Sequence, residues 1–266
     1  MPHLTPSPRI RGATRVSRAL LSQGALAAAL AALCSPSAQA FGIDKLALQL
    51  DAAPGFSAVD SLTVFNDSNE EAVFVKAQAL KWDSDLQGQL IVTPSTDLRI
   101  LPSVQRVKPG DRGVFHVRYA GAPLKGEGAY RVLFQEIRIP AGNLDEKPEE
   151  MDNTIRQGFS VGMAMTVPVY VADRSKATDT LAQVKLRATR TDGAWLLRVD
   201  NPGERHVALS RYRVDGVLHE RPLGVVLAQR EREFRLELPA GGSNLRQLEV
   251  QLTVEKDSRW VEVGLP

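Results

Sequence analysis

The residue types that most often carry chemistry are few and scattered in this chain. His116, His206 and His219 have neither the H-x-H nor the H-x-x-x-H spacing that would bring two imidazoles to one metal ion. The sequence contains no G-x-S-x-G nucleophile elbow and no phosphate-binding G-x-x-x-x-G-K loop. We therefore expect no metal site, no cofactor and no enzymatic activity.

Charged residues could form two further kinds of functional site, an acid/base pair or a surface that binds nucleic acid. Glu149 and Glu150 are adjacent but lie in a polar stretch, where a run of solvated charges is more common than a general-acid pair. Arginines are frequent after residue 173, but Asp and Glu alternate with them and no aromatic residues interleave. We expect no nucleic-acid partner, and a hydrolase on a β scaffold would need an acid/base site that the sequence does not reveal.

The first 40 residues have the order of a secretory signal peptide. Four arginines without an acidic residue precede the apolar stretch 25–33, and Ala38-Gln39-Ala40 then forms a small-residue cleavage site. The apolar stretch is shorter than the roughly 20 residues that a membrane span needs. We predict export, cleavage before Phe41 and no membrane insertion. A disordered basic tail is the alternative.

Removing residues 1–40 changes the charge and the cysteine content. The chain has 33 Lys and Arg against 31 Asp and Glu, and 4 of the basic residues lie in this segment. The remaining 29 basic and 31 acidic residues leave a net charge of −2. Cys34, the only cysteine, follows Leu33, which is unfavourable for lipid attachment. The mature protein would then contain no disulfide.

Alternation of apolar and polar residues, rather than helical periodicity, dominates the chain after Phe41. Turn clusters such as 66–69 and 108–111 separate the alternating segments, and no helix of ten or more residues is evident. About seven short strands in about 130 residues predict an immunoglobulin-like β-sandwich over residues 41–172. Its predicted strands include 46–50, 61–66, 72–82, 113–119, 130–139 and 159–171.

A second, smaller β-sandwich is predicted over residues 173–266. The polar segment 172–176 marks the boundary, and Asp192-Gly193 is typical of a hairpin tip. The fold class that we predict is therefore all-β, with two sandwich domains. The predicted strands of the second domain are 184–190, 194–200, 207–214, 233–238, 248–255 and 260–263.

The strand predicted over residues 159–171 differs from the others. Every odd position is apolar, which gives seven consecutive matches to a period of two. The segment before it, 140–157, carries five acidic residues and is long for a loop within a compact domain. An ordinary core strand is one interpretation. The other is an edge strand lent to a partner, in which main-chain hydrogen bonds give affinity and alternate side chains fill pockets.

Two features favour the edge interpretation without deciding it. Pro168 has no N–H to donate, which is tolerable at a sheet edge and unfavourable in a central strand. Met163 and Met165 suit a surface that fits several related partners, because the thioether side chain is flexible.

The order of the motifs in residues 43–172 resembles the first domain of the periplasmic chaperones of the chaperone–usher pathway. The most specific motifs are V-Q-R-V-K-P-G at residues 104–110 and Y-R-V-L-F-Q-E-I at residues 130–137. The V-P-V-Y-V ending at residues 167–171 and the region of Trp82 are most similar to the archaic branch of that family. The second domain matches only in size, strand content and position.

The resemblance implies two immunoglobulin-like domains in an L or boomerang arrangement. It also implies a non-enzymatic periplasmic chaperone that stabilises pilus or fimbrial subunits and delivers them to an outer-membrane usher. In donor-strand complementation, the last strand of the chaperone's first domain fills the gap in the subunit's own sandwich. The free edge would favour weak self-association. The implied donor residues are Phe159, Val161, Met163, Met165 and Val167.

The sequence departs from the best-studied branch, in which two basic residues bind the terminal carboxylate of the subunit. Ala47 and Val167 lie near those positions and cannot bind a carboxylate. Arg118 and Arg131 are the substitutes we favour, because both lie on strands expected to border the cleft and a guanidinium can hold a carboxylate with two hydrogen bonds. Lys45 and Arg156 are further candidates.

The alternative function is a secreted β-sandwich module that binds protein or carbohydrate without acting as a chaperone. Such a module would need an exposed aromatic platform, and an aromatic content of 6% offers few candidates.

Overall fold

The computed structural model describes residues 41–55, 57–68, 72–137, 162–176, 178–191, 194–236 and 245–266. The predicted signal peptide, the acidic segment before the odd-position strand, Arg156, Phe159 and Val161 lie outside these residues.

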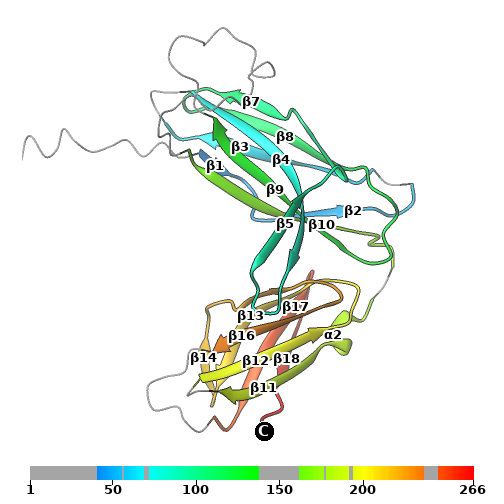
Figure 1. Cartoon of the computed structure of the whole chain (residues 1–266), viewed down its shortest axis with the longest axis vertical. Coiled ribbons are helices and arrows are strands. Elements are labelled where there is room, and N and C mark those ends of the chain that lie inside the picture. The colour runs from blue at the N-terminus through cyan, green and yellow to red at the C-terminus, as the bar shows by residue number, and fades with distance from the viewer. Residues whose placement is uncertain are drawn as a thin grey trace, which may run out of the picture. The chain divides into compact units, whose positions relative to one another are not determined.

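Strands dominate the described residues, as the alternation predicts (Figure 1). The single helix in this part of the chain is α2 (Thr180–Gln183), where the Asp179 side chain accepts the Ala182 N–H at 3.1 Å and so caps the helix. No helix among the described residues is long and apolar enough to cross a membrane.

Two sheets form the first sandwich. Sheet A has the strand order β1 (Phe41–Ile43), β3 (Val59–Asn66), β8 (Arg112–Tyr119), β6 (Leu98–Leu101). Sheet B has the order β2 (Leu48–Asp51), β10 (Ala164–Ala172), β9 (Gly128–Ile137), β4 (Val73–Ser84), β5 (Leu90–Pro94), and β7 (Val104–Val107) also pairs with β4.

The core of the first sandwich lies between these two sheets. Buried and exposed residues alternate strictly from Arg112 to Arg118 along β8, which places one face of the strand inside. Phe115 of β8 and Phe134 of β9 are fully buried and meet edge to face, with ring centroids 5.2 Å apart. This aromatic pair joins sheet A to sheet B.

Two further sheets form the second sandwich, around a core of its own. Sheet C has the order β11 (Lys185–Thr191), β12 (Ala194–Asn201), β16 (Arg230–Leu236). Sheet D has the order β14 (Val217–His219), β13 (Val207–Val214), β17 (Leu248–Val254), β18 (Asp257–Glu262), and β15 (Gly224–Val226) also pairs with β13.

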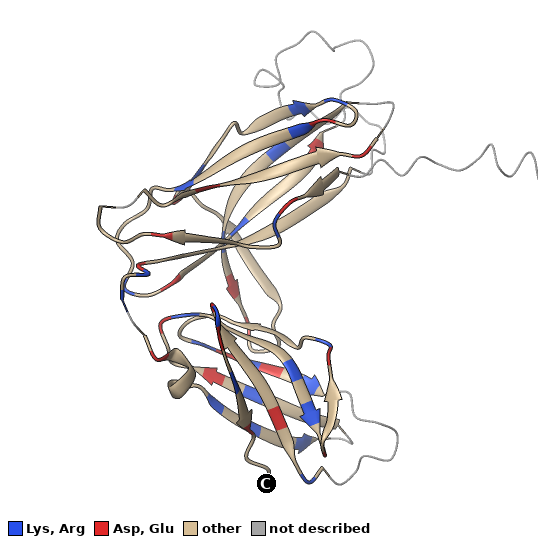
Figure 2. Ribbon diagram, turned by 180° about the vertical axis from the view of Figure 1, so that it is seen from behind, with Lys and Arg blue, Asp and Glu red and all other residues tan. Residues whose placement is uncertain are grey.

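Charges of both signs are interleaved on the strands of the second sandwich (Figure 2). Arg198 of β12 pairs with Glu231 of β16, and Arg213 of β13 lies 3.3 Å from Glu249 of β17. These two arginines are therefore matched by carboxylates on neighbouring strands.

The predicted fold class is confirmed: the described chain is all-β, with two sandwiches. Strand β10 ends at Ala172 and strand β11 begins at Lys185, on either side of the polar segment in which we place the domain boundary. The boundary itself and the L-shaped arrangement remain predictions.

We expect Phe134→Ala to lower the free energy of unfolding by about 3–5 kcal/mol, because it removes a fully buried ring and leaves a cavity between the sheets. Urea unfolding measures this change. Val114→Ala, on the exposed face of β8, is the control and should change stability by less than about 0.5 kcal/mol. A loss for Phe134→Ala as small as that of the control would contradict the assigned core.

Candidate functional site

Strand β10 has two halves with different neighbours. Residues Val169 to Val171 pair with β9 on one side and, in parallel, with β2 on the other, and Ala172 pairs with β2 alone. From Ala164 to Pro168 the strand pairs with β9 alone, and no other strand of the described chain adjoins it. The strand is therefore central in its second half and an edge in its first half, so each of the two sequence interpretations describes one half.

The direction of the main-chain groups shows what the open edge offers. The Glu136 N–H donates to the Met163 carbonyl at 2.9 Å, while the Ala52 N–H donates to the Ala172 carbonyl at 2.8 Å. Since successive residues of a strand direct their main-chain groups to opposite sides, the even-numbered residues face away from β9. Ala164 and Thr166 thus present N–H and C=O groups to the open side.

Pro168 is the third even-numbered residue of the edge half. Its missing N–H would have faced the open side, where the described chain supplies no strand to accept it. The proline therefore costs the sheet no hydrogen bond, which is the condition under which an edge strand tolerates one.

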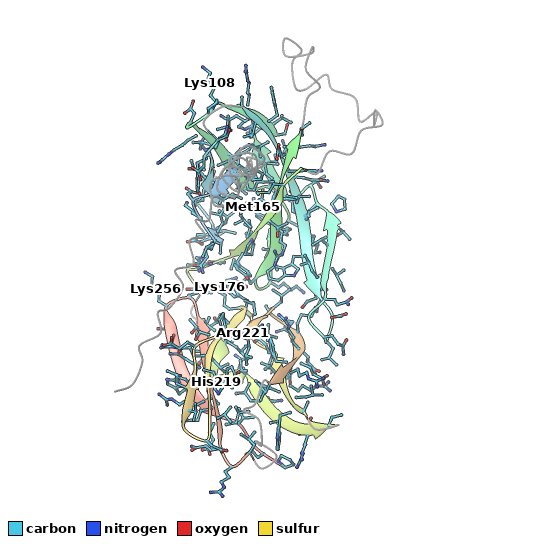
Figure 3. All side chains as sticks on the ribbon, turned by 90° about the vertical axis from the view of Figure 1, so that its left-hand side faces the viewer. Lys108, Met165, Lys176, His219, Arg221 and Lys256 are labelled. Carbon is cyan, nitrogen blue, oxygen red and sulfur yellow. The ribbon has the colours of Figure 1, made fainter. Side chains whose placement is uncertain are left out.

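The odd-numbered side chains of β10 lie in one row. This row is buried in the core in the second half of the strand and is less buried in the first half. Val167, Val169 and Val171 are buried between the two sheets. Met163 is partly buried against the same core, and Met165, labelled in Figure 3, is 36% exposed. The prediction grouped Val167 with the donor residues, whereas the structure places it in the core of its own domain.

Arg131 lies on β9, opposite Pro168, on the outer face of sheet B. Its Nη1 donates to Thr166 Oγ1 at 2.7 Å, and its Cζ lies 4.3 Å from the centroid of the Trp82 ring. Burial lowers the pKa of its guanidinium below the ordinary value. Arg131 Nε and Trp82 Nε1 are buried without a hydrogen-bond partner among the described residues, so this cluster has unsatisfied donors next to the open edge.

An aromatic stack continues this cluster toward the second sandwich. Trp82 packs against Tyr170, with ring centroids 5.9 Å apart, and Tyr170 stacks on His206 at 3.6 Å. Glu127 Oε1 lies 2.6 Å from His206 Nδ1 and accepts the His206 main-chain N–H at 2.9 Å. Burial, with a further contribution from the Glu127 carboxylate, raises the pKa of Tyr170 above its ordinary value. The phenol therefore stays neutral beside Arg131.

The structure does not bring the two predicted arginines together. Arg118 is exposed on β8 in sheet A, whereas Arg131 lies on β9 in sheet B, so the two arginines expected to border the cleft belong to different sheets. Of the further candidates, Lys45 Nζ is paired with Asp60 at 2.8 Å. Arg131 is the basic candidate that the structure places beside the open edge.

The three histidines that follow residue 40 occupy separate surroundings. His116 Nδ1 is 2.8 Å from Ser61 Oγ on the outer face of sheet A, and His219 stacks on Tyr212. His206 belongs to the aromatic stack described above. Among the described residues no three His, Cys, Asp or Glu side chains are grouped as a metal site.

No protein-family model matches the sequence, and no curated protein matches it. Solved structures do match. A chain of the complex between the CsuC chaperone and the CsuE tip adhesion subunit, from the archaic chaperone–usher Csu pili of Acinetobacter baumannii, is 15% identical with a TM-score of 0.58. The match covers 85% of this chain and 99% of that one.

Two further structures give the same result. A chain of the Salmonella enterica SafA pilin in complex with the SafB chaperone is 14% identical, with a TM-score of 0.58 and coverage of 86% of this chain and 99% of that one. The CupB2 chaperone of Pseudomonas aeruginosa is 17% identical, with a TM-score of 0.53 and coverage of 85% and 100%. The two-sandwich fold of this chain is thus the fold of the chaperones that serve pilus assembly.

We expect Arg131→Met to expose the Trp82 ring, because the guanidinium covers it. In a background with Trp195→Phe and Trp260→Phe, acrylamide quenching of the remaining Trp82 fluorescence should increase about twofold. Arg118→Met removes the same group from the other sheet and should leave the quenching unchanged. Equal quenching in both variants would contradict the placement of Arg131 over Trp82.

Proposed function

We propose that this chain is a periplasmic chaperone that binds pilus or fimbrial subunits by donor-strand complementation. The observation that carries the proposal is the half-open strand β10, whose apolar row continues out of the core along an unpaired edge. The fold supports it, because the matched CsuC and SafB chaperones were solved in complex with a subunit and a pilin.

The open edge supplies both parts of strand-mediated recognition. Ala164 and Thr166 offer main-chain donors and acceptors to an incoming strand, and their small side chains do not obstruct its approach. Met163 and Met165 offer flexible apolar side chains to pockets of the subunit. Phe159 and Val161 extend the same odd-numbered row in the sequence and complete the proposed donor set. Val167 is excluded from it, because its side chain already serves the core of the chaperone.

The apolar row explains why a subunit would gain from the interaction. Burying a methionine side chain is worth about 1.5–3 kcal/mol, and a subunit with a missing strand has an apolar groove that would otherwise meet water. Each partner thereby covers a surface that favours aggregation when it is free.

Arg131 is the proposed anchor for the subunit's terminal carboxylate. Its guanidinium is half-buried beside Thr166 of the open edge, and its unpaired Nε adds a free donor. A carboxylate bound there would satisfy buried donors, which is the situation in which a charge-assisted hydrogen bond contributes most.

Location and further partners follow from the same proposal. The segment of residues 1–40 would direct export and be removed, and the loaded chaperone would deliver its subunit to an outer-membrane usher. An unoccupied donor edge would self-associate weakly, because an exposed apolar edge can pair with a second copy.

The alternative function, a protein- or carbohydrate-binding module, receives no support from the described surface. The large apolar residues that are exposed there are aliphatic or methionine, among them Leu90, Ile91 and Met165. None of them is aromatic, so the stacking platform that a carbohydrate site needs is absent from the described residues.

We expect the double change Met163→Asp and Met165→Asp to abolish subunit protection. Each carboxylate would have to enter an apolar pocket unpaired, which should reduce intact subunit at least about tenfold. The measurement is the amount of a candidate pilus subunit that survives and copurifies after periplasmic co-expression. Val114→Asp places the same charge on an exposed apolar position of sheet A and should protect normally. Equal protection by the double variant and the wild type would refute the donor-edge proposal.

We expect Arg131→Ala to weaken binding of a peptide that carries the subunit's last strand and its free carboxylate. Loss of a hydrogen bond between charged groups corresponds to about 1.5–3 kcal/mol, or at least about tenfold in Kd by titration calorimetry. The same peptide with an amidated C-terminus should bind wild type and Arg131→Ala alike. If Arg131→Ala weakens both peptides equally, Arg131 does not hold the carboxylate.

A further inference from the structure

The hairpin formed by β4 and β5 extends beyond the other strands of sheet B (Figure 1). Strand β4 pairs with β9 as far as Lys81, and residues 82–84 pair with β5 alone. The turn that joins the two strands is ordered by Asp85, whose Oδ1 accepts the Gln89 N–H at 2.7 Å. This hairpin therefore projects as a preformed arm rather than as a loose loop.

The arm contacts strand β16, which is an edge strand of sheet C. Arg230 donates from Nε and Nη2 to the two carboxylate oxygens of Asp83, both at 2.8 Å. The Glu233 N–H donates to the Leu86 carbonyl at 2.7 Å. Because an edge strand has outward N–H groups without a strand partner, the hairpin tip satisfies one of them.

Gly88 fits the tip against Arg232 of the same strand. A Cβ at Gly88 would lie 2.1 Å from Arg232 Nε, and the φ of +80° also favours glycine. The guanidinium is held from the other side, since its Nη1 donates to the Val225 carbonyl at 2.9 Å and its Cζ lies 4.6 Å from the Phe234 ring. Burial lowers the pKa of Arg232. The tip and β16 are thus in direct contact.

Two other regions join the sandwiches away from the hairpin tip, and Trp82 at the base of the hairpin packs with Tyr170 and Leu227 in the second of them. In the connecting segment, the Arg174 N–H donates to Asp51 Oδ1 at 3.0 Å, and Arg205 Nη2 donates to the Asp173 carbonyl at 2.6 Å. The contact of Glu127 with His206 is the second region. Contacts at one or two points would still allow the second sandwich to rotate relative to the first, whereas a third separate contact prevents this rotation.

We propose that the β4–β5 hairpin is a strap that locks the second sandwich onto the first. It supplies the third contact, and its tip does so through a backbone hydrogen bond and a two-bond ion pair, while Trp82 at its base packs against Leu227. The strap concerns the protein without a bound subunit. Its test therefore does not depend on whether the proposed chaperone function is correct.

The ion pair makes the strap sensitive to salt and strongly acidic pH. The side chains of Asp83 and Arg230 are 40% and 48% exposed, so salt screens their attraction. The hydrogen bonds from Arg230 hold the pKa of Asp83 below its ordinary value of 3.8. Because folding lowers the pKa of Asp83, the ion pair contributes fully to stability at pH values above 3.8. This contribution is lost as the pH falls through the lowered pKa of the folded state.

Hydrogen exchange of the Glu233 amide tests the strap, since its partner is the Leu86 carbonyl of the hairpin. In the full mature chain without any subunit, we expect Asp83→Ala and Arg230→Ala each to accelerate this exchange about twofold to fivefold. The reversed pair, Asp83→Arg with Arg230→Asp, should restore most of the protection. Arg235→Ala is the matched control, because Arg235 is an exposed arginine of the same strand with no partner among the described contacts.

The outcomes separate a strap from a chance contact. Faster exchange at Glu233 with unchanged exchange in the β12 amides shows that the hairpin has detached while sheet C stays folded. Unchanged exchange at Glu233 in both single variants, or the same acceleration in Arg235→Ala, overturns the proposal.

Gly88→Val gives an independent test. It should accelerate exchange of the Glu233 amide at low and at high salt, whereas the effect of Arg230→Ala should shrink in 1 M salt. No acceleration in Gly88→Val would also overturn the proposal.

Discussion

The antiparallel pairing of β9 with β10 is the constraint on which the candidate site depends. It uses the main-chain groups of the odd-numbered residues of β10, as the bond from the Glu136 N–H to the Met163 carbonyl shows. The even-numbered groups are left for another strand. Strand β2 takes them from Tyr170 onward, and before that point they face the open side. One set of hydrogen bonds thus gives the strand a fixed half and an available half.

The alternation of residues 159–171 was sufficient to predict a strand and the face on which its apolar row lies. It could not predict where along the row the core ends, because that depends on where β2 begins to pair. Leu48 is opposite Val169, more than a hundred positions away in the sequence, and no local pattern reports this register. Val167 was therefore placed with the donor residues although its side chain is 4% exposed and belongs to the core.

Sheet membership was the second property that local patterns could not supply. Arg118 and Arg131 both lie on strands with clear alternation, yet β8 joins β3 and β6 while β9 joins β4 and β10. The interdomain ion pair was equally hidden, because Asp83 and Arg230 are 147 positions apart. What the residues did predict was local: strands, turns and the all-β class, along with the unusual proline in an apolar strand.

Among the described strands of sheet B, both β10 and β5 have an open edge, and their comparison shows why β10 is the better candidate. The bonds from Asp85 N–H to Gln89 and from Ser95 N–H to Ala79 indicate that Leu90, Val92 and Pro94 turn their main-chain groups outward from β5. Each edge thus directs two N–H groups and one proline outward, with no strand partner among the described residues, so the number of available main-chain donors does not distinguish the two edges. The difference lies in the side chains. The apolar row of β10 extends from the core of its own sandwich along the open edge, whereas β5 belongs to a hairpin whose tip already contacts β16.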